Sequence, residues 1–329
     1  MIRYIIKRIL TIIPVVLLVA IVVFTVMYFS PGNPAEIILG GSATQEEVAQ
    51  LEAQLGLDQP FFVQLGKFMY NTFLRFDLGR SYSNNIEISK ELALRFPLTL
   101  RLAVFAIILE LIIGIPLGMV SAVNRNRWPD HVCMVIALIG VSVPSFWIGI
   151  ELILLFANKW HLLPAFGVKT WLGWILPVFV VSLRGTAQMA RQARSSMLEV
   201  INSDYVVTAR AKGLTENSIL FRYALPNALI PLIQTAGNSF ATSLGGAIVI
   251  ESLFSIPGIG QYMVQAIAGR DYTVIRGTVV VLSIAFCIIM LIVDLAFAFV
   301  DPRIKAQYEG KKRRHTYKKR REKEVGSRA

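Results

Sequence analysis

Charged side chains stand inside several long apolar stretches of this 329-residue chain. Glu110 and Glu151 each lie within such a stretch, and Arg184 lies within another. An ionisable group is costly in the hydrocarbon core of a membrane, so it usually faces a bundle interior or a water-filled path. We therefore predict these three residues as candidates for a translocation path. Alternatives stay open: Arg184 pairs with Glu110 or Glu151 or snorkels inward, and Glu110 makes a structural contact with a neighbouring helix without touching substrate.

No motif for covalent or metal chemistry accompanies these charges. Neither Gly66-Lys67 nor Gly310-Lys311 is followed by the Ser or Thr of a phosphate-binding loop, and no HExxH or nucleophile elbow occurs. The cysteines, Cys133 and Cys287, lack metal or redox spacing. The chain is therefore expected to have no active site, to bind no metal or cofactor itself, and to take energy for any active transport from elsewhere.

Membrane-spanning helices are the elements that must position these charges. The chain is 55% hydrophobic with a mean hydropathy of +0.59, which is too apolar for an ordinary soluble domain. A cleaved signal peptide is the alternative for the first stretch, but its 21 apolar residues exceed the usual core of about 7–15. Gly114 and Gly118 are expected to allow close helix contact at the second span, and Pro144 is expected to kink the third span. Six spans are predicted, at 9–29, 98–123, 133–157, 171–190, 228–250 and 277–300.

The segment 31–97 between the first two spans is polar enough to lie outside the membrane. Thr44 and Glu47 have the spacing of a capping box, and the helix that they open should stop near Gly56. Aromatic residues from Phe62 to Phe76 then recur at helical spacing. We expect a helical segment whose aromatic stripe packs against the rest of the protein, with membrane contact as the alternative.

The stretch from Asp204 to Pro226 has the pattern of two short helices around a glycine corner. An N-cap near Asp204 opens the first helix, and Gly213 suits the left-handed residue that ends it. Thr215 can cap the second helix, which Pro226 is expected to end. A thin helix with basic edges can enter a groove on another protein, although an ordinary cytoplasmic loop would also fit the pattern.

The same stretch resembles the cytoplasmic loop of ATP-binding cassette importer permeases, whose pattern is E-A-A-x-x-x-G followed by I-x-L-P. Thr208-Ala209 fall at the two alanines, Gly213 at the glycine and Leu225-Pro226 at the closing L-P, while Val207 replaces the glutamate. The form TARAKGL followed by LPNALIP is similar to the branch that transports dipeptides, oligopeptides and nickel (B-type permeases), as is the segment RFPLTLRLA.

This resemblance implies the fold and a set of functional positions. The expected fold is an all-α integral membrane protein of the type I importer permease class, with six transmembrane helices, a helical extracytoplasmic insertion and a cytoplasmic coupling helix. The segment ESLFSIPGIGQYMVQ is similar to the outer loop of the family. It implies an outer gate at Pro257, Gly258, Ile259 and Gly260, where the glycines by themselves indicate only a tight turn. The ATPase-coupling positions implied are Tyr205, Thr208, Ala209, Arg210, Ala211, Lys212, Gly213, Leu214, Leu225 and Pro226.

Partners and substrate also follow only from the resemblance. It implies a heterodimer with a second related permease, two ATPase subunits that hold ATP and Mg, and an extracytoplasmic solute-binding protein. Peptides are favoured over nickel because the sequence has no His/Cys cluster. A secondary transporter driven by an ion gradient through Glu110, Glu151, Asp294 and Arg184 is the main rival, and a membrane scaffold is another.

The distribution of basic residues predicts the orientation. From Asp301 to Ala329 there are twelve Lys/Arg and four Asp/Glu, and the other short segments expected inside also hold more Lys/Arg than the short outer loops. Both termini are therefore expected in the cytoplasm of a prokaryotic cell, with the tail on anionic membrane lipid and no nucleic acid bound. The predicted divisions are an anchor span (1–30), an outer segment (31–97), a five-span core (98–300) and a basic disordered tail (301–329).

Overall fold

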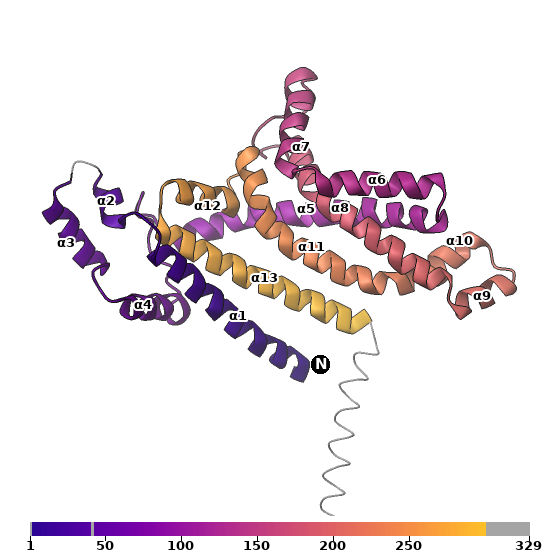
Figure 1. The fold of residues 1–329 in the computed structure, drawn as a ribbon, viewed down its shortest axis with the longest axis horizontal. Coiled ribbons are helices and arrows are strands. Elements are labelled where there is room, and N and C mark those ends of the chain that lie inside the picture. The colour runs from indigo at the N-terminus through magenta and orange to yellow at the C-terminus, as the bar shows by residue number, and fades with distance from the viewer. Residues whose placement is uncertain (1, 41–42, 301–329) are drawn as a thin grey trace, which may run out of the picture.

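The computed structural model describes residues 2–40 and 43–300, and these form helices and connecting segments, with an isolated bridge between Arg80 and Glu87. The predicted basic tail, 301–329, lies outside the described residues. Five long helices are α1 (Ile2–Tyr28), α5 (Ile88–Val123), α8 (Leu172–Ile201), α11 (Leu225–Leu253) and α13 (Tyr272–Val300). They run side by side in Figure 1, where α8 packs between α5 and α11, α13 follows α11, and α1 packs on the outside of α13.

Shorter helices join the long ones. Outside the bundle lie α2 (Pro34–Leu39), α3 (Gln45–Leu55) and α4 (Phe61–Leu74), and α12 (Ile259–Ala268) connects α11 to α13. Between α5 and α8 come α6 (Trp128–Ser142), α7 (Ser145–Leu152) and the π-helical η1 (Ile153–Lys159). Between α8 and α11 come α9 (Asp204–Ala211), α10 (Glu216–Ser218) and the π-helical η2 (Ile219–Ala224).

Four helices in the described part of the chain are long and apolar enough to cross a membrane: Arg8–Tyr28, Ile88–Val123, Leu172–Ile201 and Tyr272–Phe297. The pair Trp128–Ser142 and Ser145–Lys159 adds a fifth if both are counted as one span. The α11 helix, expected as a span at 228–250, is not among them. Its 29 residues are long enough to cross a membrane, but small and polar side chains such as Asn238, Ser239 and Thr242 lower its mean hydropathy.

The expected third span is broken rather than kinked. The axes of α6 and α7 meet at 98°. Val143 has extended backbone angles (φ −85°, ψ 132°), as a residue before proline prefers, and Pro144 supplies no N–H to continue the ladder of α6. The prediction of a single kinked helix from Cys133 to Ala157 was therefore wrong.

Two other predicted span limits also shift in the structure. The α5 helix begins at Ile88 instead of Leu98 and continues through Pro97, so the predicted division between residues 97 and 98 falls inside a helix. An ion pair between Arg95 and Glu91, with 2.7 Å between Nε and Oε2, stabilises its first turns. The α8 helix extends past the expected end at Ala190 to Ile201. Hydropathy alone could not give these limits, since both extensions carry several charged side chains.

Close contact between α5 and α8 depends on two glycines. A Cβ atom on Gly114 would lie 2.8 Å from Cβ of Met189, and one on Gly118 would overlap the carbonyl of Ala190. Neither glycine has a positive φ, so space and not backbone freedom selects them. The prediction that these glycines allow close helix contact is confirmed.

The outer segment folds largely as its capping signals predict. Thr44 and Glu47 form the expected capping box at the start of α3, and Gly56 ends it with φ +70°. The aromatic stripe divides into two sets. Phe68 packs inward with its ring 5.4 Å from that of Phe24, while Phe62 is 81% exposed. The predicted packing is therefore confirmed for Phe68, whereas membrane contact by the exposed side of α4 stays a prediction.

Candidate translocation cavity and inner hairpin

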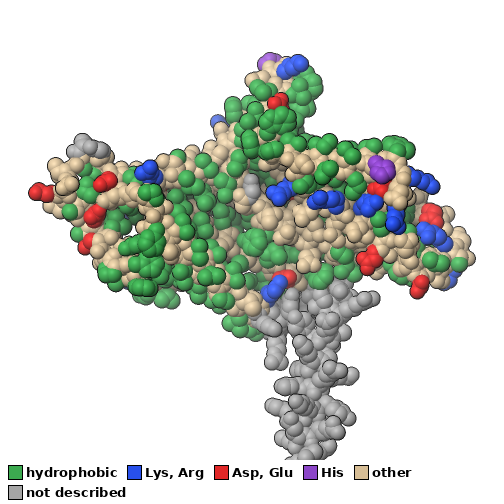
Figure 2. Space-filling view, in the orientation of Figure 1, with side chains coloured by type: hydrophobic (Ala, Val, Ile, Leu, Met, Phe, Trp, Pro, Cys, Tyr) green, Lys and Arg blue, Asp and Glu red, His purple; other side chains and the backbone are tan. Residues whose placement is uncertain are grey.

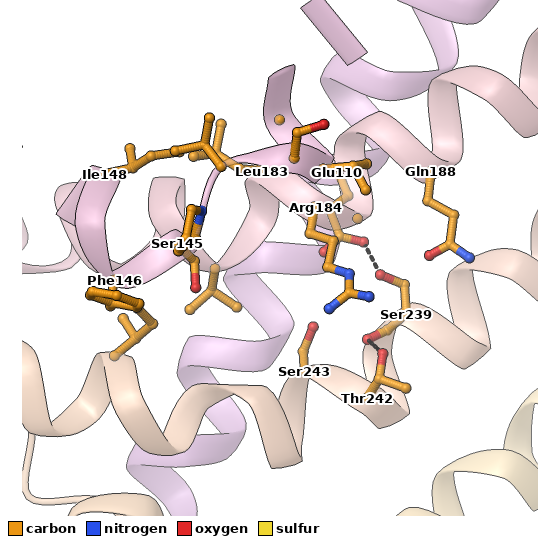
Figure 3. Close-up of a pocket in the computed structure, with 18 of the residues that line it drawn as sticks. Glu110, Ser145, Phe146, Ile148, Leu183, Arg184, Gln188, Ser239, Thr242 and Ser243 are labelled. Atoms are coloured by element: carbon orange, nitrogen blue, oxygen red, sulfur yellow. Dashed lines mark hydrogen bonds between the residues drawn. The ribbon is translucent and has the colours of Figure 1, made fainter. Parts of the chain in front are cut away.

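A cavity of about 570 Å³ lies where α8 and α11 meet α5 and the break between α6 and α7, and we call it the central cavity. Figure 3 shows the labelled side chains converging on it from several helices. Hydroxyl, amide and charged groups face a space bounded by membrane helices, which is typical of a path for a polar solute. Its polar lining residues are Glu110, Ser142, Ser145, Arg184, Gln188, Asn238, Ser239, Thr242 and Ser243.

Glu110 joins three helices at this cavity. Its side chain on α5 is buried, and its Oε2 accepts a hydrogen bond of 2.5 Å from Oγ of Ser239 on α11. The carboxylate lies against Gly185 of α8, where a Cβ atom would overlap it. Its Oε1 has no hydrogen-bond partner among the described residues. The acid therefore fixes the positions of the surrounding helices as well as lining the cavity.

Arg184 also reaches the central cavity but pairs with neither acid. It is exposed on α8 and lines the cavity, and no salt bridge joins it to Glu110 or Glu151 within the described parts of the chain. Glu151 is exposed on α7 and does not line the cavity. The structure thus brings two of the three predicted path residues together and leaves Glu151 apart.

The polar face that α11 contributes to the central cavity was not predicted from the sequence. Asn238, Ser239, Thr242 and Ser243 all line the cavity, and Ser142 and Ser145 come from either side of the break at Pro144. The signal was present in the spacing, because pairs of polar residues four positions apart share one face of a helix.

Residues 204–226 form the inner hairpin, which projects with α9 and α10 from one end of the bundle in Figure 1. The predicted glycine corner is confirmed: Gly213 has φ +79° after α9 ends, and a Cβ there would meet no atom within 4 Å. Left-handed backbone, not crowding, therefore requires glycine at this position. Val206, Ala209 and Ile219 pack together inside the hairpin.

An ion pair closes the hairpin across the glycine corner. Arg210 donates from Nε and Nη2 to the two carboxylate oxygens of Glu216, at 2.8 and 3.2 Å. These hydrogen bonds lower the pKa of Glu216 below its ordinary value, so the pair is charged at neutral pH. Both side chains are solvent-exposed, so the pair orders the corner without adding much stability.

Two details of the hairpin differ from the predictions. Pro226 does not end the second helix; it lies in the first turn of α11, directly after η2. A first-turn position needs no N–H, so proline starts this helix instead of stopping it. Ser203 and Thr215 occupy the N-cap positions of α9 and α10, but neither side chain makes a capping hydrogen bond.

The outward surface of the hairpin is rich in apolar side chains. Val207 is 55% exposed and Phe221 is 62% exposed, beside the partly exposed Tyr205, Leu214 and Tyr223. Of the predicted coupling residues, Ala209 is buried and Leu225 is partly buried. The others are exposed: Tyr205, Thr208, Arg210, Ala211, Lys212, Gly213, Leu214 and Pro226.

The predicted outer gate forms the N-terminus of α12, and its glycines serve a different purpose from the one expected. The expected tight turn is present, since the N–H of Gly258 donates to the carbonyl of Ile256 at 2.7 Å, but with φ −90° at Gly258 the turn does not require glycine there. A Cβ atom there would lie 2.5 Å from the carboxylate of Glu251, and one on Gly260 would be 2.5 Å from Cα of Ile248. Glu251, fully buried on α11, accepts from the N–H of Gln261 at 3.1 Å. The glycines therefore make room for a buried acid that sequence analysis had assigned to a loop.

The fold and cavity define a helical membrane protein with the layout of a transport permease. Two family models match the chain: the binding-protein-dependent transport system inner membrane component over residues 114–306, and the N-terminal component of such systems over residues 1–103. The chain belongs to this family. It is a multi-pass inner membrane permease of an ATP-binding cassette transport system and has no catalysis of its own.

Curated relatives match almost the full chain. It is 41% identical over 309 residues to a putative peptide transport system permease protein of Brucella abortus, covering 92% of this chain and 98% of the relative. It is 40% identical to the dipeptide transport system permease protein DppB of Alkalihalophilus pseudofirmus, covering 93% and 100%. It is 39% identical to the glutathione transport system permease protein GsiC of Salmonella choleraesuis, covering 93% and 99%.

A solved structure supports the fold. The chain is similar to an inward-facing structure of the MetNI methionine ABC transporter, with a TM-score of 0.57 and 22% identity. The match covers 64% of this chain and 96% of the other one. About a third of the present chain thus lies outside the shared permease fold.

Proposed function

We propose that this protein is a permease subunit of an ATP-driven importer of dipeptides and oligopeptides that works by alternating access. The observation that carries the proposal is the inner hairpin, a projecting pair of short helices with exposed apolar side chains and a left-handed glycine at its corner. Relatives named for peptide, dipeptide and glutathione transport support this class of substrate over nickel. Nickel or another small solute remains the second candidate within the family.

In this proposal the hairpin docks on an ATPase subunit. Exposed Tyr205, Val207 and Phe221 would bury their apolar surface in a groove of that subunit, and Lys212 would lie at the edge. Because α11 continues directly from η2, movement of the hairpin would pass into a helix that lines the central cavity. ATP and Mg belong to the ATPase subunits in this scheme.

The variant Gly213→Asp tests the coupling role. A non-glycine residue is strained at φ +79°, and the added acid would disturb the exposed docking surface, so we expect peptide uptake to fall at least tenfold. Gly56→Asp is the matched control, since Gly56 ends α3 with φ +70° in the outer segment. Uptake into cells and the amount of assembled transporter are measured for both. Normal uptake by Gly213→Asp would contradict the proposal.

The central cavity is proposed as this subunit's share of the translocation path, with Glu110 and Arg184 among its polar groups and the partner permease completing it. Glu151, exposed on α7, is a candidate for contact with that partner instead. The residues of the α12 N-terminus, Pro257 to Gly260, are proposed as the outer gate. A secondary transporter would use the same charges, and reconstitution distinguishes the two: peptide uptake without ATP or ATPase subunits would favour the rival.

The proposed assembly contains a second related permease, two ATPase subunits and an extracytoplasmic solute-binding protein. The chain would cross a prokaryotic cytoplasmic membrane six times, with α11 as the fifth span because its polar face lines the cavity and is shielded from lipid. Both termini would be cytoplasmic, with residues 1–30 as anchor, 31–97 outside and 98–300 as the core. The tail, 301–329, is proposed to contact anionic lipid.

A further inference from the structure

A second cavity, of about 530 Å³, lies where the outer ends of α1 and α13 meet α3, α4 and the connection after α1. It shares no lining residue with the central cavity. Its lining includes one cation, Arg276, one acid, Glu52, and the tyrosines Tyr28, Tyr82 and Tyr272. We propose that this outer cavity binds the headgroup of a membrane phospholipid, with the lipid phosphate on Arg276.

Arg276 has the surroundings of an anion-binding residue. Its guanidinium lies 5.3 Å from the ring centroid of Phe24 and 5.4 Å from that of Phe68. Its Nε donates to the carbonyl of Tyr272 at 3.2 Å, and its Nη2 approaches Oγ1 of Thr273 at 3.4 Å. Asp271 lies near enough to attract the guanidinium and Tyr82 contacts it, but no carboxylate within the described ranges forms a salt bridge with it. A guanidinium half-buried among aromatic rings needs a counter-charge, and a phosphate accepts its planar pair of N–H groups well.

Glu52 gives the same cavity a site for a positive group. The acid comes from α3, and its Oε1 accepts a hydrogen bond from Nδ2 of Asn33. No salt bridge joins it to Arg276 or to another cation of the described chain. One positive and one negative side chain, facing one cavity without pairing, match a zwitterionic headgroup. Phosphoethanolamine has this chemistry, with the phosphate on Arg276 and the ammonium toward Glu52 and the tyrosine rings.

The surfaces beside the cavity favour a lipid over a soluble anion. On α4, Phe62 is 81% exposed and Leu74 is 70% exposed, and Phe29 at the end of α1 is 73% exposed. Leu18 and Val22 continue the exposed apolar face along α1. Figure 2 shows hydrophobic side chains gathered over this end of the molecule. Acyl chains leaving the cavity would cover these side chains, whereas a free anion would leave them bare.

The wall of the cavity is held in place by its own hydrogen bonds. Tyr272 donates from its hydroxyl to the carbonyl of Pro31 at 2.9 Å, next to Gly32, whose φ of +118° favours glycine. On the other side, Nε2 of Gln64 donates to the carbonyl oxygens of Leu57 and Gln59, at 2.9 and 2.8 Å. A preformed wall lowers the cost of ordering the site when a headgroup binds.

The test uses the complete transporter, purified with its partner subunits and reconstituted in nanodiscs. Bound phospholipid is counted by native mass spectrometry for the wild type, Arg276→Gln and the control Arg75→Gln. Arg75 is also an outer arginine over an aromatic ring, 5.2 Å from the centroid of Tyr70, but it does not line the cavity. We expect Arg276→Gln to lower phosphatidylethanolamine binding about tenfold or more, and Arg75→Gln to leave it unchanged.

Further arms separate the possible ligands. Glu52→Gln is expected to weaken phosphatidylethanolamine relative to phosphatidylglycerol, because only the former carries the ammonium. Arg276→Lys keeps the positive charge but loses the paired N–H donors of the guanidinium, so this variant should bind the lipid weakly. It replaces Arg276→Gln in the experiment if Arg276→Gln does not assemble. Equal lipid binding by wild type and both Arg276 variants would overturn the proposal. Thermal stabilisation by inorganic phosphate, glycerophosphoethanolamine or a dipeptide is also measured. If any of these soluble compounds stabilises the transporter as much as the lipid does, the cavity is a site for a soluble ligand and the proposal is overturned.

Discussion

Two charged residues of the central cavity are expected to differ sharply in what they contribute. Glu110 is buried and accepts a hydrogen bond from Ser239, so Glu110→Ala removes a contact between helices, worth about 0.5–1.5 kcal/mol for a typical hydrogen bond. Arg184 is exposed in the cavity without a salt bridge to the described residues, so Arg184→Ala should lower uptake without lowering stability. Thermal unfolding and uptake of both variants check this. A larger loss of stability for Arg184→Ala would contradict it.

An ion pair between a buried acid and a partly exposed arginine, Asp130 and Arg194, is expected to contribute strongly to stability. Arg194 of α8 donates from Nε and Nη2 to the carboxylate of Asp130 at 2.7 and 2.8 Å, and Asp130 also accepts from Ser121 of α5 at 2.5 Å. Asp130 is 1% exposed. Removing one partner of a buried pair typically costs about 3–5 kcal/mol because the other charge is left without compensation.

The corresponding experiment is a double-mutant cycle. Arg194→Ala should destabilise the solubilised protein strongly, and adding Asp130→Ala should recover part of the loss. Thermal unfolding measures each variant. Arg210→Ala, which breaks the exposed pair with Glu216, serves as the control and should leave the midpoint unchanged. Additive effects of the two substitutions at 130 and 194 would show that the pair does not act as a unit.

At the scale of single elements, the contact between α5 and α8 depends on missing side chains. In Gly118→Ala, the new Cβ would overlap the carbonyl of Ala190 and Cβ of Ala193, so the helices must separate. We expect destabilisation of about 1–3 kcal/mol, as for other overpacked cores. Gly66→Ala on α4 is the control, since a Cβ there meets nothing within 4 Å and alanine favours a helix. Thermal unfolding of both variants is measured. A loss of stability in Gly118→Ala alone would show that glycine is needed at 118 for close packing of the helices.

The sequence predicted elements best where local chemistry decides the structure. The capping box at Thr44, the left-handed Gly213 and the close contact at Gly114 depend on neighbouring residues or on one helix face, and all three appear in the structure. Pro144 and Pro226 were less well predicted, because the effect of a proline depends on where a helix begins. Glu251 was missed as a buried group, since burial under α12 arises only from tertiary packing.

The same distinction applies to the central cavity. Glu110 and Arg184 were identified because a charge in an apolar stretch is conspicuous by itself. The serines and threonines of α11 were not, since each is unremarkable until the helix turns them to one side. Whether Glu151 belonged with the other acids depended on the 98° break after α6, which no property of Glu151 itself could reveal.

At the scale of the whole molecule, α1 is held along the edge of the helix bundle. The solved transporter match covers 64% of this chain, and α1 packs chiefly along α13 at the edge of the bundle. Arg8 of α1 forms an ion pair with Asp294 of α13. This pair lies near the ends of α1 and α13 that are far from the outer cavity, and it stabilises the contact between the two helices there. Together with the hydrogen bond from Tyr272 to Pro31, this ion pair joins α1 and the segment after it to both ends of α13.

The orientation of the whole chain in the membrane yields the last prediction. If the inner hairpin lies in the cytoplasm and the outer segment faces away from it, Asn217 and Glu46 must be on opposite sides; both are exposed. Each is changed singly to cysteine after Cys133 and Cys287, both buried, are replaced by alanine. A membrane-impermeant maleimide should label Glu46→Cys in spheroplasts and Asn217→Cys only in inside-out vesicles. Labelling of Asn217→Cys in spheroplasts would place the hairpin outside the cell, where no cytoplasmic ATPase subunit could contact it, and would contradict the proposed coupling.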